Sequence, residues 1–555
     1  MDGNHTSSFD NPNPKHRYDR IDVASRLDDF DQQHPDISQR GFAEQSQTPR
    51  STLRHWLQRR RELDLAPGLA RFLESAEGTE FLHHILVAVH LVFEADCGCG
   101  LRNISRFLEL SRLDRVIAAS YGTQQAYAKD IVHSIVEFGN NQRQQLGPGM
   151  SPRDITVCED ETFHPETCLV AIEPVSGMIL LEAYRDRRDA QTWNESLEAA
   201  LKGLPVTVVQ SVSDEALGLK AHAKDVGAHH SPDLFHVQQE LSHATSVSLA
   251  SEVRRRQIAA DEALQTARTK ADERDACLQQ CPTSAAVNDL TTEAFALIEH
   301  AKQKRQSVRE AEARRATAAS ARRGVSDDHH PFDLTDGSVR ESEVVDRRLR
   351  ERLDTLDAVA DAAGLSEAAR ARIAKARRVL PGLVATVAFF WKWVRERVSK
   401  LSLSEAVERS LIEDQLAGEY LSLAAARAST AKRRWELREL SEQLLSRARD
   451  GPLSELPPSE REELIGECRN WAALFQRSSS CVEGRNGQLS LSHHSLHRLQ
   501  GERLESLTVL ANHFHRRADG TSAADRFYGQ PSADLFEWLV DRVRRLPRPG
   551  KSLHV

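Results

Sequence analysis

The stretch from residue 244 to residue 472 constrains the fold of this chain more than any other part, because it carries no strand signal. It is rich in Ala, Arg, Glu and Leu, as in EVRRRQIAADEALQTARTKADERDA, which is typical of long helices packed as hairpins or coiled coils. A polar break at residues 322–338 divides it. Because a structureless loop of this length is implausible within a compact domain, we predict an all-helical insertion domain.

The segment before it, residues 149–243, has the texture of a mixed α/β layer. The apolar runs ITVCED, CLVAIEP and MILLEAY predict three strands in hairpin succession, with PVSG as a turn. A helix at residues 188–203 precedes a fourth strand, VTVVQSVSD, and a helix at 215–227 precedes a fifth, DLFHV. We therefore expect an α/β core interrupted by the helical insertion, in a chain that is mainly α overall.

Two acids end predicted strands of this layer. Asp160 ends the first strand and Asp214 ends the fourth, so neighbouring strands would bring both carboxylates to one edge of the sheet. Strand alternation separates Asp160 from Glu159 and Glu161 and favours Asp160 as the functional acid. Two carboxylates there suit Mg²⁺, which prefers oxygen ligands. Asp214 could instead cap the helix that follows it.

Glu483 is the candidate for a third carboxylate. It lies in RSSSCVEGRNGQLS, within residues 473–545, where we expect helices that return to the α/β core before a tail at 546–555. Three carboxylates can hold two metal ions about 4 Å apart, an arrangement that serves phosphoryl transfer. Arg485 is close enough to Glu483 to reach a phosphate, and Asn486 beside it is a further candidate DNA contact. Glu483 taken alone would be interpreted as a surface acid.

The N-terminal part is predicted to be helical and to bind DNA over residues 36–148, after a disordered tail at 1–35. A short helix at SQRGFAEQ precedes a second one that Thr48 can cap and Pro49 can begin. Two helices joined by a brief turn indicate a helix-turn-helix, whose second helix enters the major groove.

The second helix of this pair separates apolar from basic residues. Its apolar face has the helical spacing i, i+3, i+4, through Leu53, Trp56 and Leu57. Candidate DNA contacts lie on its other faces: Arg50, Ser51 and Arg54. From Ser38 to Arg61 there are six arginines and one glutamate, which favours DNA binding over a basic helix in an ordinary bundle.

Charge and cysteine content exclude several classes of protein. A formal net charge of -8 argues against a uniformly basic binder, so nucleic-acid contacts must come from local basic patches. The 8 cysteines form neither a disulfide framework nor a paired zinc motif, which suits a reducing cytoplasm. No apolar run reaches the length that a membrane span requires, so we expect no membrane association and a cytoplasmic protein.

Taken together, these residues resemble the DDE transposase superfamily, which has an RNase H-like fold. The resemblance is carried by the order β-β-β-α-β-α-β-α and by the motifs CEDETF, QSVSDEALGL, SPDLFHVQQEL and RSSSCVEGRNGQLS. Asp233 and His236 match the [Cys/Asp]-x-x-His element of several such families. The long interval before Glu483 is similar to that of hAT-type and P-element-type transposases. No residue inside the helical insertion can be matched to the family, so no function is carried over there.

The resemblance implies a DNA transposase that binds element ends and catalyses phosphodiester hydrolysis and strand transfer through Asp160, Asp214 and Glu483. It implies Mg²⁺ as cofactor, with Mn²⁺ able to substitute, and double-stranded DNA as partner, both terminal repeats and target. A homo-oligomer on DNA is expected, with His236 as a further DNA contact. The alternatives are a structure-specific nuclease on the same fold and a non-catalytic DNA-binding protein of transposase descent.

Overall fold

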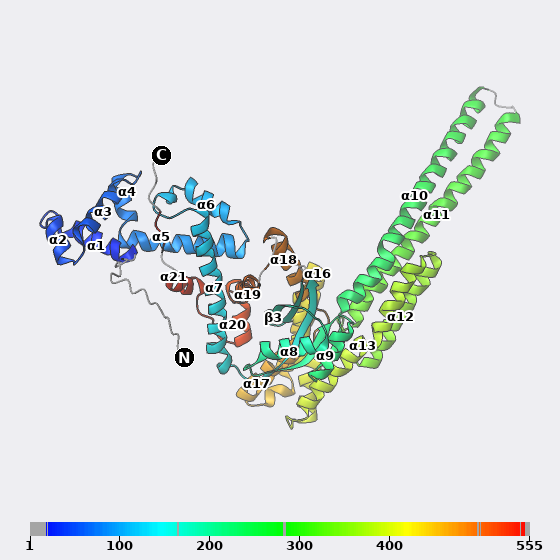
Figure 1. Cartoon of the computed structure of the whole chain (residues 1–555). Coiled ribbons are helices and arrows are strands. Elements are labelled where there is room, and N and C mark those ends of the chain that lie inside the picture. The colour runs from blue at the N-terminus through cyan, green and yellow to red at the C-terminus, as the bar shows by residue number, and fades with distance from the viewer. Residues whose placement is uncertain are drawn as a thin grey trace, which may run out of the picture. The chain divides into compact units, whose positions relative to one another are not determined.

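The structure is a computed structural model that describes residues 18, 20–163, 166–280, 285–496, 499, 501–543 and 546–549. The chain divides into two compact units, one built from residues 151–487 and one from residues 1–150 with 488–555. Both are mainly helical, and the larger one contains a five-stranded sheet (Figure 1). The expectation of a mainly α chain with a small mixed sheet is thus confirmed. Among the described helices, none is both long and apolar enough to cross a membrane.

The sheet has the strand order β3-β2-β1-β4-β5. Its first three strands form an antiparallel meander, whereas β1, β4 and β5 are parallel. Helices α8 (Ala190–Leu201) and α9 (Leu217–Asp225) make the two crossovers that parallel pairing requires. The strands are β1 (Arg153–Phe163), β2 (Thr167–Glu173), β3 (Met178–Arg185), β4 (Val206–Ser213) and β5 (His229–Pro232).

The predicted fifth strand at DLFHV was wrong. The strand lies just before it, at His229–Pro232, and the long helix α10 (Leu234–Gln280) begins inside the predicted stretch. The Asp233 carboxylate accepts a hydrogen bond from the backbone N–H of Phe235 at 2.7 Å. Such a cap satisfies a donor of the first helical turn and starts the helix there.

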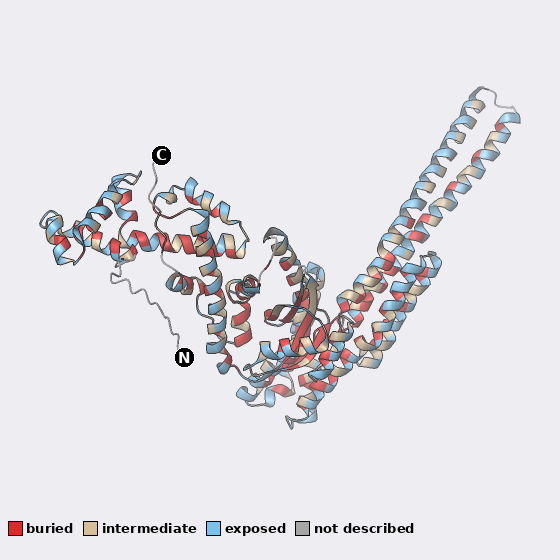
Figure 2. Cartoon of the chain, in the orientation of Figure 1, coloured by how far each residue is buried: buried red, intermediate tan, exposed pale blue. Residues whose placement is uncertain are grey.

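The two faces of the sheet have different covers. Ile155 and Val157 of β1 face α8 and α9, in a core with Trp193 and Leu219. The opposite face carries Thr156, Cys158 and Asp160, and segments that lie later in the chain, at residues 474–486, cover it. Both faces of the sheet are therefore buried, as the red strands in Figure 2 show.

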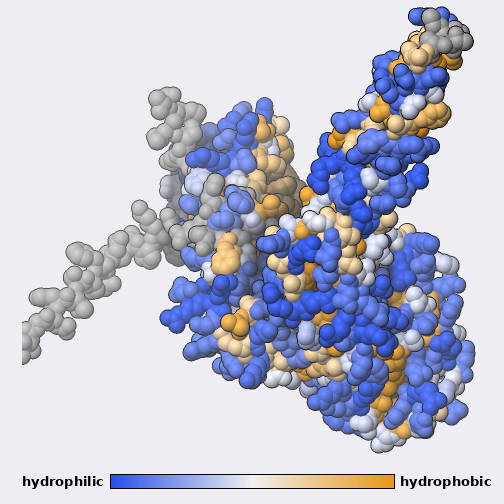
Figure 3. All heavy atoms as spheres, turned by 90° about the vertical axis from the view of Figure 1, so that its right-hand side faces the viewer, coloured by the Kyte–Doolittle hydropathy of each residue, from blue (hydrophilic) through white to orange (hydrophobic). Residues whose placement is uncertain are grey.

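The predicted helical stretch is helical, and its first two elements form a long hairpin (Figure 1). Helix α10 runs beside α11 (Ala285–Asp328), and buried alanines recur at intervals of seven residues, at 260 and 267 in α10 and at 294 and 301 in α11. A small residue at each heptad lets the two backbones approach closely. The face of this hairpin seen in Figure 3 is mainly hydrophilic.

Further helices pack at the base of the hairpin. They share one apolar core with the start of α10 and the end of α11, including Phe332, Phe390 and Trp391. These helices are α12 (Ser342–Ala362), α13 (Glu367–Val398), α14 (Glu405–Ser410), η4 (Leu411–Leu416), α15 (Ala417–Ala426), α16 (Ala431–Asp450) and α17 (Pro458–Leu474).

In the other unit, three N-terminal helices share a small core. Residues Val23, Leu27 and Phe30 recur at helical spacing and bury α1 against its neighbours. Part of the predicted disordered tail at 1–35 is therefore a helix, and its residues before Tyr18 lie outside the described residues. The three helices are α1 (Arg20–Gln33), α2 (Gln39–Gln45) and α3 (Arg50–Arg61).

The turn between α2 and α3 differs in detail from the expectation. Pro49 is the N-cap of α3 rather than its first residue, and it makes no side-chain cap. The Thr48 hydroxyl does not cap the helix but accepts a hydrogen bond from Arg26 of α1 at 2.8 Å. Leu53, Trp56 and Leu57 are buried as predicted.

The rest of this unit combines helices from the N-terminal and C-terminal parts of the described chain. The C-terminal helices pack on α5 and α7 through Val509, Leu535 and Leu539. The described residues between 488 and 543 therefore join the N-terminal helices instead of returning to the α/β core, which corrects the predicted boundary. The remaining elements are α4 (Pro67–Leu73), α5 (Ala76–Val89), η1 (His90–Asp96), α6 (Leu101–Leu110), η2 (Leu113–Arg115), α7 (Tyr121–Leu146), η3 (Gly147–Gly149), α19 (Gly501–Val509), η6 (Leu510–Phe514), α20 (Ala523–Tyr528) and α21 (Leu535–Arg542).

Close packing of α13 on β5 yields a stability prediction. A Cβ atom on Gly382 would lie 2.5 Å from the rigid ring of Pro232, so Gly382→Ala should destabilise the chain by about 1–3 kcal/mol. The matched control is Gly466→Ala in α17, where a Cβ meets nothing within 4 Å and should stabilise by up to about 1 kcal/mol. Urea unfolding of both variants measures the difference, and equal midpoints would contradict the close approach.

Candidate functional site

Asp160 and Asp214 occupy adjacent positions on neighbouring parallel strands. The β1–β4 pairing matches Cys158 with Val212, so the same register two residues on sets Asp160 opposite Asp214, just after the end of β4. Paired strands lie about 4.8 Å apart. The Asp214 carboxylate accepts a hydrogen bond from the Ala216 backbone N–H at 2.8 Å, two residues on, while Ala216 itself is the N-cap of α9.

Helix α18 (Ser480–Leu496) brings further polar groups to the face of the sheet that carries Asp160. The Asn486 side-chain amide donates a hydrogen bond to the Asp160 carboxylate at 2.9 Å. Glu483 lies one turn earlier on the same helix, and its Oε1 is 3.6 Å from Nε2 of His236 on α10. The structure thus gathers Asp160, Glu483, Asn486 and His236, with Asp214 on the next strand.

The electrostatics of Asp160 reflect these neighbours. The pKa of the Asp160 carboxyl is raised to about 6, mainly by burial and also by the charges of Glu483 and Asp214. A backbone hydrogen bond at Glu161 and the nearby His236 lower it in part. Neighbouring carboxylates form an anionic cluster, whose repulsion a cation would relieve.

The residues of this cluster fit a hard cation by their donor chemistry. All three acids offer carboxylate oxygens, and Oδ1 of Asn486 is buried with no hydrogen-bond partner. Such oxygen ligands are those that Mg²⁺ prefers. Within the part of the chain that the structure describes, however, no three His, Cys, Asp or Glu side chains form a closed metal-binding group. Each acid has a local contact instead, through Asn486, Ala216 and His236.

The two acids that flank Asp160 face the opposite side of the sheet. Glu159 is fully buried, with one carboxylate oxygen 3.2 Å from Nε2 of His222. Glu161 accepts a hydrogen bond from the Trp193 indole at 3.2 Å. The alternation of side chains along β1 therefore places Glu159 and Glu161 on the face of the sheet opposite to Glu483.

A short segment between α17 and α18 attaches α18 to the sheet. The Thr156 hydroxyl donates a hydrogen bond to the backbone carbonyl of Leu474 at 2.6 Å. The Gln210 side-chain amide donates one to the backbone carbonyl of Gln476 at 2.9 Å. Gln210 is fully buried in β4. Sequence reasoning missed its role, although a glutamine inside the apolar run VTVVQSVS was a signal that its amide has buried partners.

The DLFH motif supports the site from α10. Asp233 is 2% exposed, and besides capping α10 it accepts a hydrogen bond from the Ser479 hydroxyl at 2.6 Å. His236 follows one turn later and faces Glu483. Asp233 thus joins the start of α10 to the start of α18, and His236 lies beside Glu483.

Arg485, which was predicted to contact DNA, forms an ion pair within the chain. Its guanidinium makes two hydrogen bonds of 2.7 Å to the carboxylate of Glu182 in β3. The side chains are 9% and 0% exposed, respectively. This bidentate ion pair holds α18 on the sheet, and the DNA contact of Arg485 stays a prediction. Asn486 likewise binds Asp160.

The predicted DNA contacts Arg50, Ser51 and Arg54 belong to the other unit. All three are exposed, in the N-terminal half of α3. Leu53 and Trp56 form the buried apolar face on another side of the helix. This arrangement presents cations and a hydroxyl to solvent.

Comparison with known protein families gives a match over the C-terminal part of the chain. Residues 411–555 match a family described as "Family of unknown function (DUF6399)". This stretch includes Glu483 and all of α18, but neither Asp160 nor Asp214. Among curated proteins, none matches the chain.

The raised pKa of Asp160 predicts that replacing this residue by neutral Asn changes the stability of the chain in a pH-dependent way. The carboxyl group has an ordinary pKa of 3.8 and a folded-state pKa of about 6, so its ionisation destabilises the folded state as pH rises through 6. In metal-free buffer, Asp160→Asn should therefore raise the melting temperature at pH 8, and the gain should shrink toward pH 5.

Differential scanning fluorimetry across pH, with and without Mg²⁺, measures this effect. Millimolar Mg²⁺ should stabilise the wild-type chain at pH 8 more than at pH 5, because protons compete for the same oxygens. The Asn variant should respond less at pH 8. A difference between the two proteins that is constant across pH would contradict the assignment.

Proposed function

We propose that this chain is a DNA transposase of the DDE type, which cuts and joins phosphodiesters at element ends. The observation that carries this assignment is the placement of Asp160 and Asp214 on neighbouring strands with Glu483 on a helix over the same face. The element order β1-β2-β3-α8-β4-α9-β5-α10 supports an RNase H-like core, since it agrees with that of the superfamily the sequence resembles.

Asp160, Asp214 and Glu483 would hold Mg²⁺, or Mn²⁺ in its place. Such an ion supplies Lewis acidity at a phosphate and lowers the pKa of bound water. The residues of the chain position these ligands: Asn486 orients Asp160 by its hydrogen bond, and His236 lies beside Glu483. No protein nucleophile is needed, because water or a DNA 3′-hydroxyl attacks in line.

DNA binding is assigned to the helix pair α2–α3 as a helix-turn-helix. Arg50, Ser51 and Arg54 are exposed on α3, where a recognition helix presents its N-terminal residues to base edges and phosphates. The partner is double-stranded DNA, both the terminal repeats and the target. Joining two ends to one target calls for a homo-oligomer on DNA.

The catalytic assignment predicts the loss of cleavage in three single variants. Asp160→Ala, Asp214→Ala and Glu483→Ala should each lower Mg²⁺-dependent cleavage by at least about 100-fold, because each removes a carboxylate from the cation site. A supercoiled plasmid that carries the DNA flanking the gene is the substrate. The matched control is Glu195→Ala on α8, which covers the other face of the sheet and is exposed.

The products of this assay separate the alternatives. Joining of a 3′-end to a second plasmid supports a transposase, whereas cleavage without joining indicates a nuclease on the same fold. Cleavage at the wild-type rate by Glu483→Ala would refute the trio. Absence of cleavage by the wild-type chain in both Mg²⁺ and Mn²⁺ would favour a non-catalytic DNA-binding protein.

The DNA-binding assignment predicts a change in salt dependence. Replacing Arg50 and Arg54 together by Ala should weaken binding to flanking DNA, and two lost phosphate contacts should lower the slope of log K against log salt by about two. Gel-shift titration at several KCl concentrations measures this. The matched control replaces exposed Arg71 of α4 and Lys129 of α7, and an equal effect there would remove α3 from the interface.

A further inference from the structure

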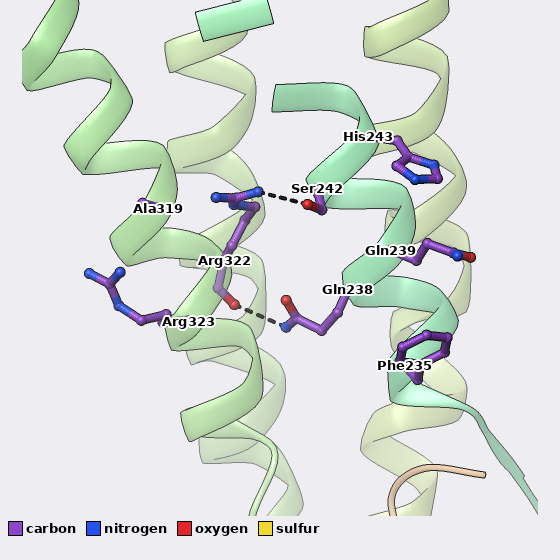
Figure 4. A pocket seen from close by; sticks show the side chains of 8 residues that line it. All are labelled: Phe235, Gln238, Gln239, Ser242, His243, Ala319, Arg322 and Arg323. Carbon is purple, nitrogen blue, oxygen red and sulfur yellow. Dashed lines mark hydrogen bonds between the residues drawn. The ribbon is translucent and has the colours of Figure 1, made fainter. Parts of the chain in front are cut away.

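A groove of about 440 Å³ lies at the base of the hairpin, next to the acidic site. Figure 4 shows its side chains on successive turns of two helices that face each other. The lining residues are Phe235, Gln238, Gln239, Ser242 and His243 of α10 and Ala319, Arg322 and Arg323 of α11.

The groove is cationic. No acid is among its lining residues, although the whole chain has a net charge of -8. Arg322 donates hydrogen bonds to the hydroxyls of Ser242 and Ser246, and its Nε is buried without a partner. Arg323 and His243 are exposed. Two adjacent arginines without a lining carboxylate attract an anion.

The acid nearest in sequence is engaged elsewhere. Glu240 accepts hydrogen bonds from Arg372 and Lys375 of α13, each at 2.7 Å. Its charge is therefore neutralised by another helix and does not cancel that of Arg322 and Arg323. The positive character of the groove is local and built by side chains of the hairpin itself.

The groove is continuous with the acidic site along α10. The Phe235 ring lies 5.7 Å from that of His236, and His236 faces Glu483. From Phe235 to His243 the helix rises by about 12 Å at roughly 1.5 Å per residue. This length corresponds to about three or four nucleotide steps at 3.4 Å each.

The chemistry of the lining suits a nucleic-acid strand. Arginines and exposed amides contact phosphate and sugar oxygens, and an aromatic ring offers a surface for stacking a base. Phe235 is 39% exposed and lies at the end of the groove nearest Glu483. An apolar partner fits poorly, because the lining is polar apart from Phe235 and Ala319.

We propose that this groove binds the sugar-phosphate backbone of the DNA strand that leads to the acidic site. Arg323, Arg322 and His243 contact its phosphates, Gln239 binds a sugar or phosphate oxygen, and Phe235 stacks on an unpaired base beside Glu483. This assignment names the DNA path for the proposed transposase chemistry and therefore rests on that function.

Charge reversal in the groove tests the assignment. The double variant Arg323→Glu and His243→Glu is measured by fluorescence anisotropy against a 30-base-pair duplex from the flanking DNA, in EDTA. It is compared with a parent protein that keeps Arg323 and His243. The variant and the parent both also carry Arg50→Ala and Arg54→Ala, so that binding by α3 does not dominate. The affinity should fall by at least about 10-fold at moderate salt and the salt slope by about one to two.

The matched control is Arg438→Glu on α16, an exposed arginine that does not line the groove. It should change the affinity by less than about twofold. Because the substituted groove residues are exposed, unchanged melting temperatures are expected for all variants. Equal affinities of the groove variant and the Arg438 variant would overturn the assignment, as would tighter binding of an RNA duplex than of the DNA duplex.

A second measurement concerns Phe235. Phe235→Ala should weaken binding of DNA with a 3′ single-stranded extension by about 5-fold or more, and binding of a blunt duplex much less, because stacking needs an unpaired base. Equal losses for both probes would overturn the stacking role.

The groove and the proposed function can fail separately. A wild-type chain that binds DNA through the groove but never cleaves it supports the groove and refutes the transposase. The opposite result is normal cleavage by the wild-type chain together with a groove variant that binds DNA as well as the Arg438 control does. That result would overturn the DNA-binding role of the groove but not the transposase function.

Discussion

The structure of the larger unit depends on one largely buried stretch of main chain, residues 474–479, which contacts both the sheet and the end of α11. Its carbonyls accept hydrogen bonds from Thr156, from Gln210 and from the backbone N–H of Leu234. A buried carbonyl left without a partner costs about 1–3 kcal/mol. These bonds therefore lock three parts of the chain together: the sheet, the start of α10 and the segment that leads into α18.

Because this segment is locked, α18 can offer its first turns to the acids of the sheet. The buried pair of Arg485 with Glu182 fixes the rotation of the helix, and Asn486 then meets Asp160. Burial, together with the charges of Glu483 and Asp214, raises the pKa of Asp160 to about 6. Like charges held together by packing are a common basis of functional sites, and the cationic groove along α10 begins beside them.

Sequence patterns predicted the elements that depend on local periodicity. The alternation of β1 separated Asp160 from Glu159 and Glu161, and the apolar spacing of α3 predicted its buried face. The predictions that were wrong concern boundaries. A composition rich in polar residues masked the apolar stripe of α1, and DLFHV contains a helix cap at Asp233 that outweighs its strand-like apolar residues.

The sequence by itself determined which residues can form helices and strands, which face of β1 carries Asp160, and that a long helical body separates Asp214 from Glu483. Only the tertiary structure decided the partners. Arg485 meets Glu182 across 303 positions of the chain, and helices α19 to α21 pack with the N-terminal helices. The physical reason is that backbone period sets the direction of a side chain, whereas its partner depends on which distant element fills the space opposite, and no local pattern encodes that choice.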